Sequence, residues 1–303
     1  MRIAALFAVV RGFFCVKPSV EGEGGNGRLR SKNETVEELL WRANAWFFDL
    51  DGSIHFGDAV APGAREVVAR LRAAGKRVAY VTNNSRHSAA EIAAKLRGLG
   101  LAAEAEDVVA ATEGVGRYAR ERYGSLRVKA AGSDALRAAL AAAGHEVVGI
   151  DDEACPEAVV VGLDRAFAYA KLARLVRDIK RGAKLIAANA DRSHPGSGGA
   201  SVPETGALVA AIEAAVGARA EFAGKPEPHL FRYALELGGW QAGNCVMVGD
   251  NYGTDIVGGK RAGMLTAWLS GLDESAVASS ASSHPDADLI VRHLPDIHHL
   301  LGG

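Results

Sequence analysis

The chain has 303 residues, of which 49% are hydrophobic and 23% are charged, and its formal net charge is −1. This length favours two domains, and the composition is that of a globular protein. A charge so close to zero gives no sign of a surface that attracts polyanions, so we expect no nucleic-acid partner.

The N-terminal segment is predicted to lie outside the fold. Its apolar run over 3–10 is interrupted by Arg11 and is too short to cross a bilayer, so we expect no membrane partner. A polar, glycine-rich stretch over 21–27 then favours flexibility. We therefore predict a flexible tail over residues 1–44 and a cytoplasmic protein, with an organellar transit peptide as the alternative.

The cysteines do not indicate a metal site or a disulfide framework. They number three, are widely separated and form no CxxC pair: Cys15, Cys155 and Cys245. Reduced thiols are therefore expected.

Buried strands and helices are predicted to alternate from residue 45 onward. The strands are short apolar runs over 46–50, 77–81, 127–132, 145–150, 158–161, 184–188, 245–248 and 265–269. The helical patterns cover 62–74, 88–99, 133–143, 169–180, 205–216 and 228–237, and residues 108–123 are predicted to form a short strand followed by a helix. A segment rich in Gly, Ser and Pro over 194–203 is predicted to be a loop. This alternation predicts an α/β fold with parallel sheets covered by helices on both faces.

Polar side chains follow several of these strands. Asp49 and Asp51 come after the first strand, and Asp250 follows the strand over 245–248. Because ligands of open α/β sheets bind beyond the carboxyl ends of the strands, we expect these side chains to converge. The same argument applies to Thr82, Asn83 and Asn84 after the second strand, and to Lys225 before the last long helix.

Such a set of groups is suited to phosphoryl transfer. Carboxylates that share one site repel each other unless a cation neutralises them, and oxygen ligands with open positions for water suit Mg²⁺. A lysine, a hydroxyl and the backbone N–H groups near Gly52 could hold a tetrahedral dianion. A carboxylate nucleophile, a metal and a cationic group together indicate this chemistry.

The motifs resemble those of the haloacid dehalogenase superfamily. Residues 49–53 (DLDGS) resemble its first motif, and Thr82-Asn-Asn, Lys225-Pro and residues 249–255 (GDNYGTD) resemble the second, third and fourth. They occur in the family's order, and each lies on the expected strand end or helix start. The resemblance covers the chain from about residue 45 to its end.

The long gap between the second and third motifs resembles the class II branch, which carries a cap domain there. Segments 160–165, 189–191 and 205–208 are similar to p-nitrophenyl, phosphoglycolate and pyridoxal phosphate phosphatases. The resemblance implies a Rossmann-like parallel-sheet core with an inserted α/β cap domain. The predicted boundaries are a tail over 1–44, core over 45–124, cap over 125–219 and core over 220–303.

The resemblance also implies a role for each motif residue. Asp49 would attack phosphorus and bind Mg²⁺, and Asp51 would act as general acid and base while its backbone carbonyl binds the metal. Asp250 would complete the metal site, and Asp255 would orient water at the metal.

The phosphoryl oxygens would be held by residues of the other motifs. Thr82, Asn83, Asn84 and Lys225 are assigned to phosphate binding, and Gly52 permits close approach of the backbone. His194 precedes Pro195 at the position of the substrate-specificity loop, as in pyridoxal phosphate phosphatases; the alternative is a solvated histidine on a polar loop.

The predicted function is hydrolysis of small phosphorylated metabolites, with Mg²⁺ as cofactor. Phosphoglycolate, pyridoxal phosphate and sugar phosphates are candidate substrates, and p-nitrophenyl phosphate would be an unspecific one. Asp51 favours phosphatase over dehalogenase chemistry, because a halide leaving group needs no acid. A regulatory protein that binds a phosphorylated ligand without turnover, and a phosphotransferase with another acceptor, are the alternatives. The resemblance further implies a homodimer formed through the cap.

Overall fold

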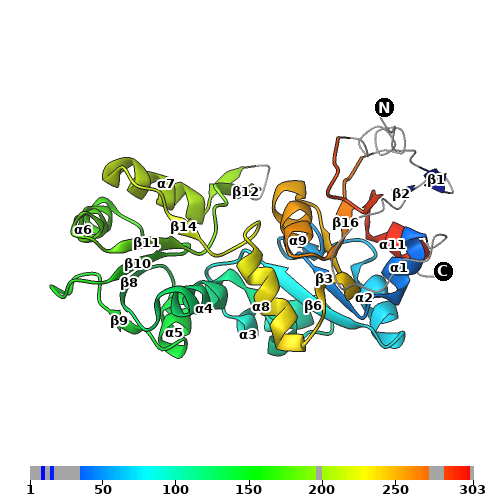
Figure 1. Cartoon of the computed structure of the whole chain (residues 1–303), viewed down its shortest axis with the longest axis horizontal. Coiled ribbons are helices and arrows are strands. Elements are labelled where there is room, and N and C mark those ends of the chain that lie inside the picture. Colours follow the sequence, from blue (N-terminus) through cyan, green and yellow to red (C-terminus); the bar gives the residue numbers. More distant parts are fainter. Residues whose placement is uncertain (1–7, 11–13, 17–34, 196–199, 273–282, 301–303) are drawn as a thin grey trace, which may run out of the picture. The chain divides into compact units, whose positions relative to one another are not determined.

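The computed structural model describes residues 8–10, 14–16, 35–195, 200–272 and 283–300. The chain divides into two compact units (Figure 1). The first comprises 1–81, 96–102 and 234–303, and the second comprises 82–95 and 103–233. Each unit is built around its own sheet, which is mainly parallel in the first unit and wholly parallel in the second.

Within the first unit, the strands of the eight-stranded sheet follow the order β1-β2-β17-β16-β15-β3-β6. These strands are Ala8–Val10, Phe14–Val16, Leu289–Val291, Leu265–Leu269, Cys245–Gly249, Ala45–Phe48 and Arg77–Thr82. Strand β2 pairs antiparallel with β1 and β17, whereas the pairs from β17 to β6 are parallel. Strand β3 is buried at every position, as its continuous apolar sequence predicts.

A topological switch point lies between β3 and β15. From β3 the chain moves outward to β6, and from β15 it moves the opposite way, through β16 to β17. The two central strands are in register, since Val248 pairs with Phe48. Their carboxyl ends therefore open the crevice in which ligands of such sheets bind.

Helices and short elements complete the first unit. They are α1 (Val36–Arg42), α2 (Ala64–Ala73), α9 (Val257–Arg261), α11 (Leu294–Leu300), the 3-10 turn Ala242–Asn244, the π-helical turn Tyr252–Ile256 and the β4–β5 hairpin (His55–Phe56 and Ala59–Val60). Helices α3 (Ala89–Gly98) and α8 (Pro228–Gly238) each contain residues of both units.

The second unit contains a sheet of strand order β14-β11-β10-β8-β9, in which every pair is parallel. The strands are Glu221–Phe222, Lys184–Ala187, Ala158–Val161, Arg127–Ala131 and Glu146–Val148. The chain moves outward from β8 to β9, and then from β10 through β11 to β14 on the other side. This sheet therefore has a switch point of its own, between β8 and β10.

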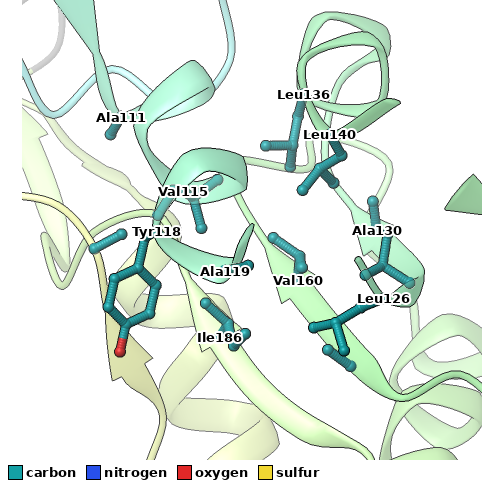
Figure 2. Close-up of a cluster of buried hydrophobic side chains, with 14 residues drawn as sticks. Ala111, Val115, Tyr118, Ala119, Leu126, Ala130, Leu136, Leu140, Val160 and Ile186 are labelled. Atoms are coloured by element: carbon teal, nitrogen blue, oxygen red, sulfur yellow. The ribbon is translucent and has the colours of Figure 1, made fainter. Parts of the chain in front are cut away.

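Helices cover both faces of this second sheet (Figure 1). On one face, α4 (Ala111–Tyr123) and α5 (Asp134–Ala142) pack over alternate strand residues, among them Val160 and Ile186 (Figure 2). On the other, α6 (Tyr169–Lys180) and α7 (Thr205–Val216) pack over the intervening positions, such as Val159. Strand β7 (Val108–Ala110) leads directly into α4.

The predicted α/β class with parallel sheets is confirmed. Helices α6 and α7 and strand β16 have the predicted bounds. The prediction of a loop over 194–203 was wrong. Strands β12 (Ser193–Pro195) and β13 (Ser201–Pro203) at its two ends form an antiparallel hairpin. The glycines at its centre and the proline that ends each strand hid the pairing of the flanking residues.

Parts of the predicted tail are folded. Strand β2 adds to β17, and Leu40 of α1 is buried. Thr35 caps α1, since its side chain accepts from the N–H of Glu38 while the Glu38 carboxylate accepts from the N–H of Thr35. Within the predicted tail, the structure describes residues 8–10, 14–16 and 35–44, and the others lie outside the described residues.

Candidate active site

Two aspartates mark the carboxyl ends of the central strands in the first unit. Asp49 directly follows β3 and Asp250 directly follows β15. The backbone N–H of Asp49 donates to the carbonyl of Val248 at 2.9 Å, which continues the pairing of the strands up to this point. Both aspartates are thus placed at the switch point by the register of the sheet.

Three carboxylates come together at this switch point. One oxygen each from Asp49, Asp250 and Asp255 lies within 4.8 Å of the other two. Asp49 and Asp255 are buried. Carboxylates at such separations, two of them buried, repel each other unless a cation lies between them, and an all-oxygen set suits a hard divalent ion. The residues therefore fit the predicted metal. The Asp255 carboxylate, which was predicted to orient water at the metal, lies beside the other two carboxylates.

Gly52 is required by the close approach of Asp250. Its φ is +95°, and a Cβ atom at this position would lie 2.4 Å from Oδ2 of Asp250. Any other residue would be strained in the backbone and would displace that carboxylate. The glycine predicted to allow close approach is thus tied to the acidic cluster itself.

Two residues that the sequence analysis did not assign hold Asp250 in place. The hydroxyl of Ser53 donates to Oδ1 of Asp250 at 2.9 Å and accepts from its backbone N–H at 3.0 Å. The indole N–H of Trp268 donates to the carbonyl of Asp250 at 2.8 Å. Asp250 is therefore fixed through its side chain and both of its backbone polar groups.

Asp255 is positioned by the turn that follows β15. Oδ1 of Asn251 accepts from the N–H groups of Gly253 and Thr254, which begins the helical turn. The carboxylate of Asp255 then accepts from the N–H of Asn251 at 3.1 Å. A Cβ on Gly249 would lie 2.3 Å from this carboxylate, so glycine is needed there for space.

Asp51 differs from the clustered aspartates in its exposure. Its side chain is 65% exposed, and Oδ1 lies 3.5 Å from Nδ1 of the buried His55. A β-bridge joins the two residues, and the N–H of Gly52 donates to the His55 carbonyl at 2.9 Å. An exposed carboxylate on a tight turn can exchange protons with water, as a general acid and base must.

The remaining predicted site residues belong to the second unit. Lys225 is buried, and its backbone is bound by the carboxamide of Asn83: Oδ1 accepts from the Lys225 N–H at 2.8 Å and Nδ2 donates to its carbonyl at 3.1 Å. Nδ2 of Asn83 also donates to Asp191 at 3.0 Å, and the Asn189 amide donates to the Asn83 carbonyl at 2.6 Å. Asn83 is therefore a positioning residue for Lys225.

Thr82 and Asn84 begin the turn before α3. Oγ1 of the buried Thr82 accepts from the N–H of Asn84 at 3.1 Å. Oδ1 of Asn84 accepts from the N–H groups of Arg86 and His87 at 3.0 and 2.8 Å. This carboxamide oxygen builds the turn, a role that the sequence analysis did not assign to Asn84.

His194 lies on β12, and its ring contacts a carboxylate. Its Nδ1 lies 2.7 Å from Oε1 of Glu204, the residue that precedes α7. Burial raises the pKa of Glu204, and the neighbouring His194 opposes this rise. The histidine thus has a local partner, and its predicted contact with substrate stays a prediction.

Comparison with known proteins identifies the family. The model of the haloacid dehalogenase-like hydrolases matches residues 46–146, and a HAD-hydrolase-like model matches residues 222–297. Chronophin from Rattus norvegicus is 34% identical over 292 residues, which cover 90% of this chain and 93% of chronophin. The chain belongs to the haloacid dehalogenase-like hydrolases.

Other relatives of this hydrolase are phosphatases as well. Glycerol-3-phosphate phosphatase from Gallus gallus is 33% identical over 90% of this chain and 94% of its own length. The structure of 4-nitrophenylphosphatase from Thermotoga maritima matches with a TM-score of 0.76 and 28% identity, over 86% of this chain and 98% of that one.

A magnesium complex is known for one structural relative. Glycerol phosphate phosphatase from Mycobacterium tuberculosis matches with a TM-score of 0.70 and 34% identity, over 76% of this chain and 68% of that one. This hydrolase is thus a phosphoric monoester hydrolase of the capped class IIA branch, and the predicted family and enzyme class are confirmed. No helix in the described part of the chain is long and apolar enough to cross a membrane.

Proposed function

We propose that this hydrolase is a Mg²⁺-dependent phosphatase of small phosphorylated metabolites, which forms a phospho-aspartyl intermediate on Asp49. The observation that carries the proposal is the cluster of Asp49, Asp250 and Asp255 at the switch point of the first sheet, with oxygens within 4.8 Å. Three carboxylates held so closely need a cation, and one of them directly follows the central strand.

In this mechanism, Asp49 is the nucleophile and Asp51 is the general acid and base. A carboxylate oxygen of Asp49 forms a bond to phosphorus while the bond to the leaving oxygen breaks, and the carboxyl of Asp51 gives that oxygen its proton. Asp51, now ionised, takes a proton from water, whose oxygen attacks phosphorus and releases phosphate from Asp49. The exposure of the Asp51 side chain, 65%, supports proton exchange with solvent.

The metal would be held by this chain's own oxygens. Asp49 and Asp250 contribute carboxylates and Asp51 its backbone carbonyl, while the Asp255 carboxylate lies beside the first two. Bound Mg²⁺ supplies positive charge that offsets the repulsion between carboxylates and phosphate. Ser53 and Gly52 keep the Asp250 carboxylate where that charge is needed.

The phosphoryl group would be bound by Thr82 and Lys225. Asn83 holds the backbone of Lys225 through two hydrogen bonds, which fixes the start of the lysine side chain. A Cβ on Gly224 would lie 2.6 Å from Oδ1 of Asn83, so the glycine before the lysine makes this arrangement possible. Asn84 contributes by shaping the turn that follows Thr82.

Phosphoglycolate, pyridoxal phosphate and sugar phosphates are the candidate substrates. Relatives named glycerol-3-phosphate phosphatase and acid sugar phosphatase, the latter from Staphylococcus aureus, support small phosphate esters as the substrate class. We propose that residues 125–219 form the cap, that His194 within it contacts substrate, and that a homodimer forms through this domain.

A phosphate-release screen tests the proposal. The purified protein is assayed against a panel of phosphorylated metabolites with Mg²⁺ and with EDTA, beside Asp49→Asn. We expect release that needs the metal and is lost in the variant, while thermal unfolding shows the variant to be folded. Tight binding of a phosphorylated compound without release from any member of the panel would instead support a binding protein.

A further inference from the structure

The switch point of the second sheet is occupied by a turn of the same unit. Loops leave β8 and β10 in opposite directions, because α5 covers one face of the sheet and α6 the other. Ligands of open α/β sheets bind between two such loops. In this unit, the turn over residues 84–87 is bound to both of them.

Hydrogen bonds fix this turn from the loops on either side. The hydroxyl of Ser133, after β8, donates to the carbonyl of Arg86 at 2.6 Å. The N–H of Leu163, after β10, donates to the hydroxyl of Ser85 at 3.0 Å. A Cβ on Gly162 would lie 2.7 Å from the Ser85 carbonyl, so the loop after β10 comes as close to the turn as glycine allows.

Two arginines are thereby brought to the same edge of the sheet. Arg86 follows Ser85 directly, and Arg165 follows Leu163 by two residues. Within the described residues, neither guanidinium has a hydrogen bond or an ion pair. The acidic neighbour of Arg165, Asp164, is already paired with Lys171.

The half-buried His87 lies close enough to both arginines for their charges to affect its pKa. Burial lowers the pKa of His87, and the positive charges of Arg86, Lys95 and Arg165 lower it further. Glu91 acts in the opposite direction, but its carboxylate already accepts from the N–H and hydroxyl of Ser88. An excess of positive charge therefore remains at this edge.

We propose that Arg86 and Arg165 bind a second anionic group of the substrate, a carboxylate or a second phosphate, beside the turn that occupies the switch point of the second sheet. Arginine is suited to both groups because its planar donors can bind them in a bidentate manner. Thr82 and Arg86 are four residues apart, so their Cα atoms lie at most about 14 Å from each other. This distance suits a small metabolite bound by phosphate at one end.

The inference rests on the proposed function and narrows it. Among phosphorylated metabolites, those with a second negative charge would be preferred over neutral esters of the same size. A site built to bind a charged group discriminates against analogues that lack the group, because its own charges are then left unpaired.

Paired substrates and matched variants test this inference. The kcat/KM values for phosphoglycolate and for a sugar bisphosphate are each divided by that for p-nitrophenyl phosphate, in the wild type and in Arg86→Met and Arg165→Met. We expect each variant to lower at least one ratio about tenfold or more, and the substrate affected identifies the anion. Arg165→Lys should retain part of the preference, since it keeps the charge and loses the planar donors.

Arg181→Met serves as the control. Arg181 is exposed at the end of α6, which precedes β11, and therefore lies at the opposite edge of the same sheet. Its ratios should equal those of the wild type. If the wild type hydrolyses these esters but both arginine variants keep the wild-type ratios, the inference is wrong and the proposed function stands. If the wild type releases no phosphate from any ester, the proposed function fails first.

Discussion

The two units of this hydrolase place opposite charges at equivalent points of similar sheets. In each unit the chain reverses direction beside a central strand, β3 in the first and β8 in the second. The first switch point carries the carboxylates of Asp49, Asp250 and Asp255, whereas the second carries Arg86 and Arg165. The sheet topology thus determines where a ligand can bind, and the side chains determine whether the ligand is a cation or an anion.

The largest effect is expected from removing one charge of the acidic switch point. Asp250→Asn should weaken Mg²⁺ binding at least about 100-fold, because ligand charge dominates affinity at oxygen sites. Isothermal titration calorimetry of the metal-free protein measures this directly. Asp286→Asn is the control, since this aspartate bonds Tyr252 in the same unit and is not part of the cluster. Equal Mg²⁺ affinity in Asp250→Asn and the wild type would show that the cluster is not the metal site.

In the second unit, a buried charge is expected to affect stability rather than chemistry. Lys129 is 1% exposed in the middle of β8, and its Nζ donates to Asp178 at 3.0 Å and to the carbonyl of Asp152 at 2.7 Å. Lys129→Met should lower the free energy of unfolding by about 3–5 kcal/mol, because it removes the nearer cation of the buried Asp178 carboxylate and leaves Arg177, whose Nε lies 4.0 Å from it. Chemical denaturation measures the change.

The double variant Lys129→Met/Asp178→Leu provides the control for that prediction. It removes both charges, so it should recover most of the lost stability. A single variant as stable as the wild type would show that the pair does not contribute to the second unit.

A smaller effect is expected from the hydrogen bond that orients Asp250. Ser53→Ala should weaken Mg²⁺ binding about tenfold, since residues that orient metal ligands usually contribute 10–100-fold. Ser53→Thr keeps a hydroxyl and should restore part of the affinity. An unchanged metal affinity in Ser53→Ala would contradict the role assigned to this hydroxyl.

The smallest effect concerns two thiols that report on the two units separately. Burial raises the pKa of Cys245 in β15 to about 12, so its thiolate is scarce at neutral and mildly alkaline pH. Cys155 in the second unit is exposed. In a Cys15→Ser background, iodoacetamide at pH 8 should therefore label Cys155 and leave Cys245 unmodified, as followed by mass spectrometry. Rapid labelling of Cys245 in the folded protein would show that the first sheet opens readily.

The sequence predicted those strands and helices whose own residues form a clear apolar or helical pattern. The existence of β3 could be predicted from its continuous apolar run, although the strand covers 45–48 instead of the predicted 46–50. The bounds of α6 and α7 could be predicted as well, from the helical periodicity of α6 and the alanine-rich sequence of α7. The β12–β13 hairpin was missed because the segment between its strands is mostly glycine and each strand ends in a proline. Strand β17 was missed because only three residues form it, too few to show a period.

Residues that act through tertiary contacts could not be predicted in the same way. The four motifs identified the aspartates, but Ser53 and Trp268 hold Asp250 from 197 and 18 residues away in sequence. Arg86 lies outside the four motifs, and Arg165 ends the segment 160–165 that resembles the phosphatase branch, but only the topology of the second sheet brings their loops together. Their signal in the sequence was limited to their position after predicted strands.

The most direct test of the account is to trap the phosphoryl group on Asp49. p-Nitrophenolate leaves without protonation, so Asp51→Asn should still be phosphorylated by p-nitrophenyl phosphate while its dephosphorylation is slow. After an acid quench, peptide mass spectrometry should find one phosphoryl group on Asp49, and none in Asp49→Asn/Asp51→Asn. A phosphoryl group on another residue, or phosphate release that persists in Asp49→Asn, would contradict the account.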